Sequence, residues 1–264
     1  MASCLNAAFR SAGRKSIWLA YLARAESLNA GATNPLLTRY IELVSLQAQL
    51  SHMLVETLEP LTPDCDRALL TYFNREALRP LLTLAARELT AKGKTDMASE
   101  SLELLEDLWN QVHEFQYPRD LAARLVLEVF ATELSALPHK GVETTSDRCP
   151  HCGFPILCSL AREEGMGLRR SAVCSICASE WSVPRLGCLR CGEQHASKLP
   201  VFNFDAWVHI RVDACDSCRG YLKSIDLTKD VEVLPVPEDI ASSAVNIWAF
   251  EQGYEPIGRH FFRL

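Results

Sequence analysis

The stretch CSICASEWSVPRLGCLRCG, residues 174–192, carries two Cys-x-x-Cys pairs and decides how the second half of the chain folds. The spacing of two residues lets one tight turn point both sulfurs at a single ion, and two such turns supply the four thiolates that tetrahedral zinc or rubredoxin-type iron prefers. The chain has four such pairs: Cys149/Cys152, Cys174/Cys177, Cys188/Cys191 and Cys215/Cys218. The sequence therefore predicts two tetrathiolate sites that hold two metal ions, iron or zinc.

The residue after the second cysteine of a pair supports this interpretation. Gly153 and Gly192 stand at that position in two pairs, where the turn around a metal often needs a left-handed residue. Ala178 and Arg219 stand there in the other two pairs and fit such a turn less well. The Cys149/Cys152 and Cys188/Cys191 pairs therefore carry the stronger signature of a metal-binding turn.

The four pairs can be combined in two ways. Sequential pairing places the first two pairs on one ion and the last two on the other, as two ribbons in tandem. Interleaved pairing gives a cross-brace. We favour sequential pairing because the loops inside the two ribbons are then similar in length, and only the short segment 178–187 joins them.

Other thiols and imidazoles are weaker ligand candidates. Cys4, Cys65 and Cys158 lie outside the pairs and are expected to be small buried hydrophobic residues. Eight paired cysteines leave no need for histidine, so surface or supporting roles are expected for His151, His195 and His209. A redox role for the paired thiols is the alternative, but none of the pairs opens a long helix after a strand.

Composition points to a folded chain that stays in the cytoplasm. The 264 residues are 48% hydrophobic and 23% charged, and no run approaches the ~18 apolar residues of a membrane span. The start of the chain, residues 1–16, has no apolar core of a signal peptide. Eleven cysteines in an unexported chain are better explained as metal ligands than as disulfides, because cytosolic thiols are kept reduced.

The pattern along the chain predicts a multi-domain protein: an all-α N-terminal domain, then tandem rubredoxin or zinc-ribbon-like β modules, then a C-terminal helix. The expected division is a helical domain at 1–137, a linker at 138–148, ribbons at 149–187 and 188–235, and a C-terminal helix and tail at 236–264. The expected helices cover about 6–28, 35–58, 64–75, 77–92, 96–115, 119–136 and 238–252. Short β runs are expected, among them 181–186 and 208–212.

Catalysis and nucleic-acid binding are both disfavoured. Four thiolates close the coordination shell that a catalytic metal keeps open, and the chain has no phosphate loop or nucleophile elbow. From residue 147 to residue 232 there are about eleven Lys and Arg against about eleven Asp and Glu, before thiolates add negative charge. A phosphate-binding surface normally has an excess of positive charge. With a net charge of −6, the partner is expected to be a protein.

The sequence around the pairs resembles the formate dehydrogenase accessory protein FdhE family. The resemblance rests on CSICASEWSVPR at 174–185, CLRCG at 188–192 and CDSCRGYLKSID at 215–226, with Glu238-Asp-Ile-Ala-Ser and Glu251-Gln-Gly-Tyr downstream. It covers residues 146–254, and the preceding half matches in helical character only. It implies a cytoplasmic assembly factor that contacts the catalytic subunit of respiratory formate dehydrogenase, with iron or zinc on the cysteine pairs, rather than an enzyme.

The expected function is therefore a client-binding chaperone whose metal modules display a rigid surface. The residues expected to contact the client are Glu180, Trp181, Arg185, Tyr221 and Lys223. Trp181 and Tyr221 could instead pack over the metal turns. The alternative function is a rubredoxin-like iron protein that passes one electron to the client, and a zinc-ribbon protein that binds nucleic acid is a third possibility.

Overall fold

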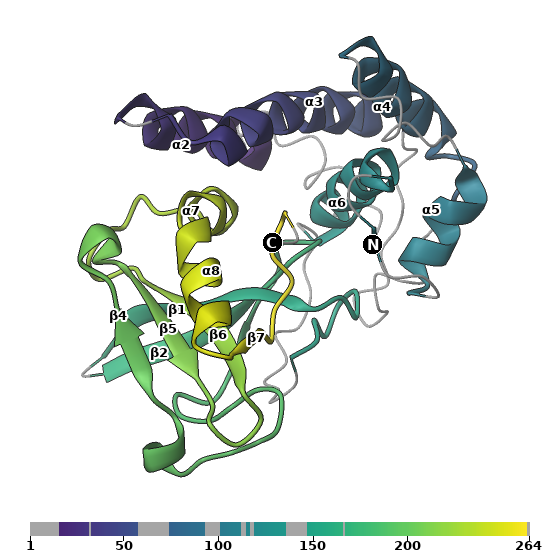
Figure 1. Cartoon of the computed structure of the whole chain (residues 1–264). Helices are drawn as coiled ribbons and strands as arrows, with labels where there is room; N and C mark the ends of the chain where they lie inside the picture. The colour runs from purple at the N-terminus through teal and green to yellow at the C-terminus, as the bar shows by residue number, and fades with distance from the viewer. Residues whose placement is uncertain are drawn as a thin grey trace. The chain divides into compact units, whose positions relative to one another are not determined.

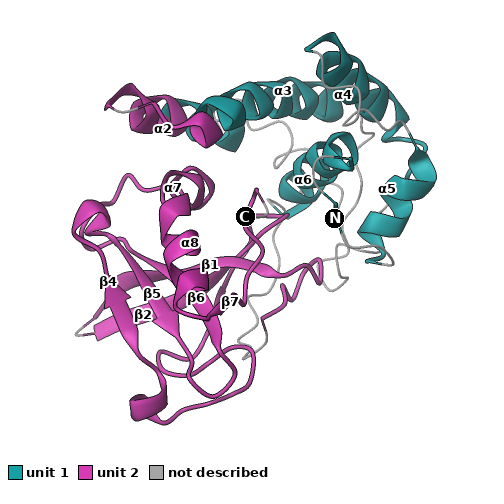
Figure 2. Ribbon diagram, in the orientation of Figure 1, with its two compact units in different colours: residues 1–23, 38–140 teal, residues 24–37, 141–264 magenta. Residues whose placement is uncertain are grey.

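A computed structural model describes residues 16–31, 33–57, 74–92, 101–111, 115–116, 119–135, 147–165 and 167–262. The chain divides into two compact units, which are coloured separately in Figure 2. Unit 1 comprises residues 1–23 and 38–140, and unit 2 comprises residues 24–37 and 141–264. Among the described residues, no helix is both long enough and apolar enough to cross a membrane.

Helices build the N-terminal half, as the sequence predicts (Figure 1). They are α2 (Ile17–Gly31), α3 (Pro35–Thr57), α4 (Arg79–Ala91), α5 (Leu102–Trp109) and α6 (Leu121–Ser135). Helix α6 forms the core of unit 1. Nearly all of its side chains are buried, and it packs against α4 and α5. Its buried charges are paired: Arg124 donates to Glu128 at 2.6 Å, and Gln47 of α3 donates to the same carboxylate at 2.7 Å. These contacts offset part of the cost of burying the two charges, although burial still raises the pKa of Glu128.

One seven-stranded sheet builds unit 2. Its strands are β1 (Ile156–Glu164), β2 (Gly167–Cys174), β3 (Glu180–Ser182), β4 (Val201–Asn203), β5 (Ile210–Ala214), β6 (Gly220–Asp226) and β7 (Glu255–Pro256). The order is β3-β2-β1-β6-β5-β4, with β7 paired to β6. The pairs β1–β2, β2–β3, β4–β5 and β5–β6 are antiparallel, whereas β1–β6 and β6–β7 are parallel. The β1–β6 pair joins the two halves of the sheet. The two predicted ribbons therefore share a sheet.

Two helices cover one face of this sheet (Figure 1). They are α7 (Pro235–Ala241) and α8 (Ser243–Glu251). Val245 and Ala249 of α8 pack with Val212 and Tyr221 of the sheet in one apolar cluster. A single helix was expected over 238–252, but the structure breaks it at Ser242, whose hydroxyl donates to the carbonyl of Glu238 at 2.7 Å.

The sequence predicts the fold class correctly: a helical region, then β modules with two tetracysteine clusters, then C-terminal helices. The helix expected at 64–75 lies almost wholly outside the described residues, as does the linker at 138–148. The sequence pattern did not predict strands β1, β2 and β6, because their mostly buried residues do not alternate between apolar and polar. The four boundaries between the five predicted segments stay predictions.

Candidate metal centres

The eight paired cysteines gather into two groups of four. Within each group the sulfur atoms lie within 4.8 Å of one another. The first group is Cys149, Cys152, Cys174 and Cys177, and the second is Cys188, Cys191, Cys215 and Cys218. The structure thus shows the sequential arrangement that we favoured from the sequence.

All four pairs adopt the same turn, and the turn explains why the sulfurs converge. In each pair the backbone N–H of the first cysteine donates to the carbonyl five residues later. The four bonds run from Cys149 to Phe154 (2.8 Å), Cys174 to Ser179 (2.9 Å), Cys188 to Glu193 (2.9 Å) and Cys215 to Gly220 (2.8 Å). A backbone N–H also points at sulfur, since the N–H of His151 lies 3.4 Å from the Sγ of Cys149. Each turn is therefore a rigid holder for two sulfurs.

The sulfur separations fit a tetrahedral metal and do not fit disulfides. In the first site Cys149 and Cys177 are 3.6 Å apart, and Cys152 and Cys174 are 3.4 Å apart. In the second site the Cys188–Cys218 and Cys191–Cys215 separations are both 3.6 Å. A metal–sulfur bond of about 2.3 Å places neighbouring sulfurs of a tetrahedron about 3.8 Å apart, whereas a disulfide bond is about 2.05 Å long.

The electrostatics of the first site require a cation if all four sulfurs are to be thiolates. Burial raises the pKa of Cys152 and of Cys174 well above the usual value, because a thiolate there is stripped of water and faces other sulfurs. A divalent ion supplies the missing positive charge and holds the sulfurs deprotonated. The donor set, four thiolates in a closed shell, fits zinc or iron.

A left-handed residue follows the second cysteine in every pair. The φ angles are 72° at Gly153, 54° at Ala178, 75° at Gly192 and 56° at Arg219. Glycine adopts this conformation without a steric penalty, but alanine does not. Arg219 has compensating contacts, since its guanidinium donates to the carbonyls of Gln252 (2.6 Å) and Gly253 (3.2 Å). The methyl group of Ala178 cannot make such bonds.

We expect the Ala178→Gly substitution to stabilise unit 2 by about 0.5–1 kcal/mol, because it relieves the left-handed strain at a modest entropic cost. Arg219→Gly relieves the same strain but removes the guanidinium contacts, so it should not stabilise. Chemical unfolding of the two metal-loaded variants measures the difference. Equal stabilisation by both, or destabilisation by Ala178→Gly, would contradict this explanation of the turns.

The two sites differ in exposure. All four cysteines of the first site are buried, whereas in the second site Cys191 is exposed and Cys218 is half-buried. Burial raises the pKa of Cys188 to about 12, whereas the backbone N–H of Glu193 lowers that of the exposed Cys191. A metal ion in the second site would therefore be more accessible to solvent than one in the first.

A chelator should accordingly remove two metal ions in two phases. We expect the faster phase to come from the second site, because a competing ligand can approach the Cys191 side of that metal. The colour change of a metal-sensitive dye measures both rates. The Cys191→Ser variant, with one accessible ligand altered, should show a selective change in the fast phase. A single phase for the native protein would contradict the inferred difference.

The residues expected to contact a client fall into two groups. Glu180 and Arg185 are exposed, so client contact stays a prediction for them. Trp181, Tyr221 and Lys223 are instead buried, at 1–2% exposure. Burial was the alternative left open for Trp181 and Tyr221, whereas the surface position expected for Lys223 is wrong. Trp181 lies on the edge strand β3, and the other two lie on β6, where α7 and α8 cover the face that they present. A position next to a metal-binding turn in the sequence does not indicate that α7 and α8 cover the residue in the fold.

Among the described residues, none of the other candidate ligands belongs to either group of four. Cys158 is buried in an apolar cluster with residues such as Leu157 and Val173, and burial raises the pKa of its thiol. Glu238 lies 2.9 Å from the Nε2 of His209, and His195 is exposed. Cys4 and Cys65 lie outside the described residues.

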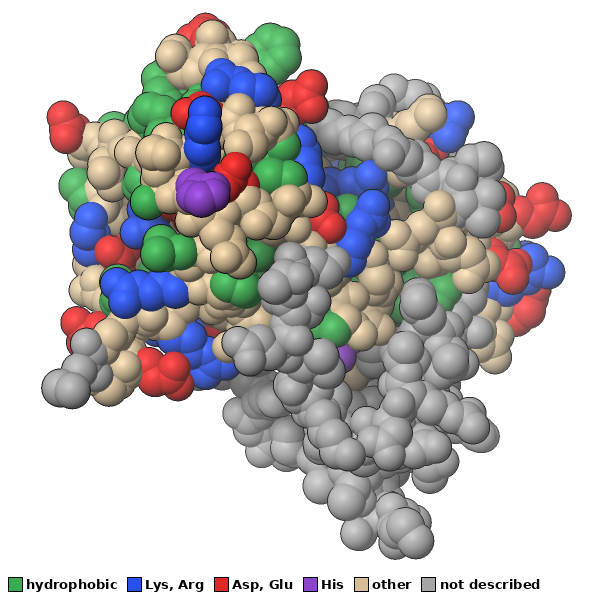
Figure 3. All heavy atoms as spheres, turned by 90° about the horizontal axis from the view of Figure 1, so that it is seen from below, with side chains coloured by type: hydrophobic (Ala, Val, Ile, Leu, Met, Phe, Trp, Pro, Cys, Tyr) green, Lys and Arg blue, Asp and Glu red, His purple; other side chains and the backbone are tan. Residues whose placement is uncertain are grey.

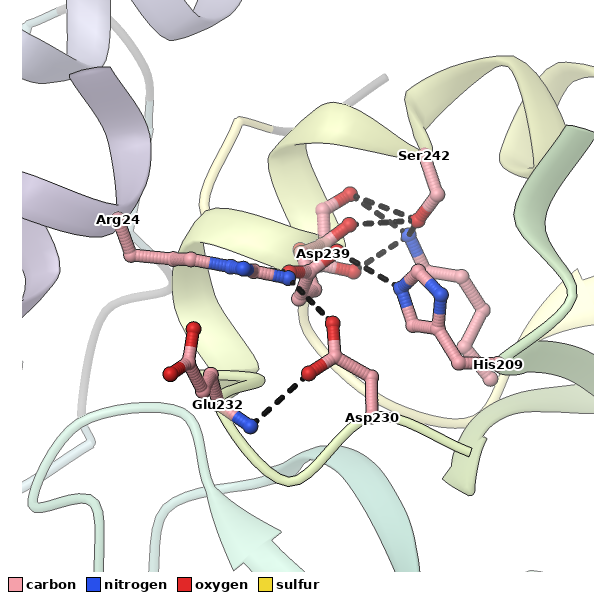
Figure 4. Close-up of polar contacts among 8 residues, drawn as sticks. Arg24, His209, Asp230, Glu232, Asp239 and Ser242 are labelled. Carbon is pink, nitrogen blue, oxygen red and sulfur yellow. Dashed lines mark hydrogen bonds and ion pairs between the residues drawn. The ribbon is translucent and has the colours of Figure 1, made fainter. Parts of the chain in front are cut away.

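A buried polar network lies under α7, and the sequence analysis missed it. The ammonium group of Lys223 lies 2.6 Å from an oxygen of Asp239 and donates to the hydroxyl of Ser242 at 3.2 Å. The Nδ1 of His260 lies 2.7 Å from the same Asp239 oxygen, and its Nε2 lies 3.2 Å from the hydroxyl of Tyr221. Figure 4 shows Asp239 and Ser242 close together in this network. One possible signal was a lysine inside the strand sequence YLKSI, residues 221–225.

A second polar cluster lies at the start of α7 (Figure 4). Arg24, which belongs to unit 2, donates to Glu238 at 2.7 Å and to Asp230 at 2.9 Å. The backbone N–H of Glu232 also donates to Asp230, at 2.9 Å, and this bond contributes most to lowering the pKa of that carboxyl. These contacts connect the loop after β6 to α7.

Residues 186–262, which contain the second site and both C-terminal helices, match the family model described as FdhE, C-terminal domain. This part of the chain is similar to the C-terminal domain of FdhE proteins. Proteins named "Protein FdhE homolog" are 35% identical over 114 residues in Aquifex aeolicus and 36% identical over 120 residues in Pseudomonas aeruginosa. Each match covers 43% of this chain and 40% or 38% of the relative, so the matched segment spans about two fifths of the curated relatives.

The fold resemblance extends over more of the chain. The crystal structure of the FdhE protein from Pseudomonas aeruginosa matches with a TM-score of 0.66 and covers 92% of this chain and 94% of that one. Sequence identity over this alignment is 21%, so the comparison shows a shared fold. The similarity of fold therefore extends beyond the segment that is similar in sequence.

Proposed function

We propose that this chain is an assembly factor for formate dehydrogenase that acts in the cytoplasm and binds the catalytic subunit during maturation. The observation that carries the proposal is the FdhE C-terminal domain together with two complete groups of four thiols. The chain's part in the process is to hold a partner protein, not to transform a substrate, because a tetrathiolate site leaves no position for one.

Metal would serve this function by fixing the binding surface. Cys149, Cys152, Cys174 and Cys177 would hold one ion beside the β1–β2–β3 half of the sheet, and the other four cysteines would hold one beside β5 and β6. Bound zinc or iron supplies folding energy there. A structural zinc site contributes ~10–16 kcal/mol in isolated fingers.

Charge distribution supports a protein partner over a nucleic acid. On the face shown in Figure 3, Lys and Arg side chains lie among Asp and Glu side chains. Binding to a phosphate backbone works by the release of counterions from many contacts and needs an excess of positive charge. A mixed surface suits a protein interface, where charge selects the partner.

Co-purification with the catalytic subunit from the same genome tests the proposal. The tagged native chain should retain the subunit, and a Cys188→Ser/Cys191→Ser variant should lose it together with the second metal. Cys158→Ser is the matched control, because it alters a buried cysteine outside both sites. Retention of the subunit by the double variant would contradict a role for the second site.

A one-electron carrier is the second candidate function, and the exposed Cys191 favours it. An iron tetrathiolate exchanges one electron without opening its shell, and the exposed Cys191 places one sulfur of the site at the surface. This function requires iron in protein isolated from cells and reversible bleaching of its visible absorption on reduction. Zinc-only protein that still supports formate dehydrogenase maturation would exclude it.

A further inference from the structure

The outer face of α8 exposes large apolar side chains. Ile247 is 53% exposed and Phe250 is 75% exposed, while Val245 and Ala249 on the opposite side are buried in the sheet cluster. Successive helical residues are turned by about 100°, which places Glu251 between the directions of Ile247 and Trp248. The outer face of this helix is therefore apolar with one carboxylate in it.

Aromatic side chains from the β4 region extend this surface. The ring of Trp248 lies 4.9 Å from that of Phe202 and 5.0 Å from that of Phe204, both edge to face. All three side chains are only partly buried and pack against the sheet cluster. We call Phe202, Phe204, Ile247, Trp248 and Phe250 the α8 face.

Two carboxylates accompany the α8 face. Glu251 lies within it, and Asp205 directly follows Phe204. Both residues are exposed, and neither has a hydrogen-bond or ion-pair partner among the residues that the structure describes. An exposed aromatic surface with unpaired carboxylates is complementary to cationic side chains, which can stack on the rings and pair with the acids.

The charge of the surrounding chain favours the same kind of partner. Residues 147–264 contain 13 Lys and Arg against 15 Asp and Glu. Two divalent ions on eight thiolates add about four more negative charges. A negative field of this kind accelerates the approach of a positively charged partner and opposes an acidic one.

The aromatic cluster already holds one guanidinium. Arg219 stacks over the ring of Tyr254 at 3.9 Å and forms an ion pair with Asp216 at 3.0 Å, and Tyr254 lies 6.1 Å from Phe202. Ring and carboxylate thus act together on an arginine of the chain itself. The α8 face offers the same two groups without an arginine in place.

We propose that the α8 face binds a cationic, apolar peptide segment of the client protein. Arg or Lys side chains of that segment stack on Phe204 and Trp248 and pair with Asp205 and Glu251, while its aliphatic side chains cover Ile247 and Phe250. The client as the source of the segment rests on the proposed function. The preference for cationic apolar peptides rests on this surface alone.

Fluorescence anisotropy with a short labelled peptide tests the surface in the full-length, metal-loaded protein. The peptide has Arg and Leu residues among Gly and Ser, and a second peptide has Glu in place of each Arg. We expect the Arg peptide to bind, with an affinity that falls as salt is added, and the Glu peptide to bind at least about tenfold more weakly.

Paired variants locate the binding. Ile247→Ser/Phe250→Ser should weaken the Arg peptide at least about tenfold, because it removes the most exposed apolar contacts. Asp205→Asn/Glu251→Gln should weaken it and reduce its salt dependence. Val231→Ser and Glu163→Gln are matched controls, since both alter exposed residues elsewhere in unit 2, and they should change affinity less than twofold.

Three results would overturn the proposal. The first is equal binding of the Arg peptide to the native chain and to both α8-face variants. The second is equal binding of the Arg and Glu peptides. The third is a dimer, detected by sedimentation, that the Ile247→Ser/Phe250→Ser variant dissociates, because the face then belongs to a second copy of the chain.

Failure of this inference can be separated from failure of the proposed function. If the α8 face is not the client's binding surface, the Ile247→Ser/Phe250→Ser variant retains the catalytic subunit as well as the native chain does. If the chain does not bind that subunit at all, the native chain fails to retain it while peptide binding is unaffected.

Discussion

A Cys174→Ser substitution is expected to unfold most of unit 2. Cys174 ends β2, contributes a sulfur to the buried first site and is hydrogen-bonded to Ser179 through its turn. Serine cannot replace a thiolate ligand, so the first metal is lost and the remaining three buried thiols have no counter-charge. Structural zinc contributes ~10–16 kcal/mol to the folding free energy of small domains. A marginally stable fold does not stay folded after a loss of that size.

Metal analysis and hydrogen exchange measure this effect together. The variant should hold one ion per chain or none, and amides of β1, β2 and β3 should lose protection. Cys158→Ser is the control: it alters a buried thiol on β1, and it should keep both ions. A Cys174→Ser protein with two ions and native protection would show that the first site is not structural.

A Lys223→Met substitution is expected to have the second-largest effect, with a loss of about 3–5 kcal/mol in the free energy of unfolding. Lys223 and Asp239 are both almost fully buried, at 1% and 2% exposure, and lie 2.6 Å apart. Removing the ammonium group takes the lysine cation away from the buried carboxylate, which keeps its contact with the Nδ1 of His260 at 2.7 Å. The penalty comes from that uncompensated charge rather than from lost packing, because methionine fills a similar volume.

The effect should depend on pH with a definite sign. Burial alone would raise the pKa of Asp239, but attraction to His260 and Lys223 and their hydrogen bonds hold it well below its usual value of about 3.9. A lowered native pKa gives stability that is present above that value and is lost as the pH falls through the native pKa. The gap between native protein and Lys223→Met should therefore be constant near neutrality and shrink below about pH 4.

Denaturant unfolding of zinc-loaded protein measures this gap. Lys198→Met is the control, since Lys198 lies on the surface of the same unit and has no buried partner. A loss below 1 kcal/mol for Lys223→Met, or a gap that widens in acid, would show that the network does not stabilise unit 2 in this way.

The sequence predicted the candidate site well because the constraint is local. A Cys-x-x-Cys turn brings its two sulfurs together whatever the rest of the chain does. Gly153 and Gly192 also revealed the left-handed position from sequence, although Ala178 and Arg219 showed that the same conformation does not require glycine. The candidate metal ligands could thus be predicted from each turn by itself.

Features that depend on distant partners could not be predicted from the sequence. The parallel contact between β1 and β6 joins residues about 65 positions apart, for example Ser159 and Ser224. No local sequence pattern therefore predicts that the two halves share one sheet. Lys223 was expected at a client-binding surface, but the docking of α7 and α8 buries it together with Tyr221. A polar side chain such as that of Lys223 is expected to be exposed unless a buried partner such as Asp239 is known.

Metal content most directly tests the claim that the fold is built on two tetrathiolate sites. Protein purified without oxygen would be analysed by mass spectrometry for metal per chain, together with its visible spectrum. We expect two ions per chain, either iron with a rubredoxin-like spectrum or colourless zinc. A protein folded without stoichiometric metal would contradict it.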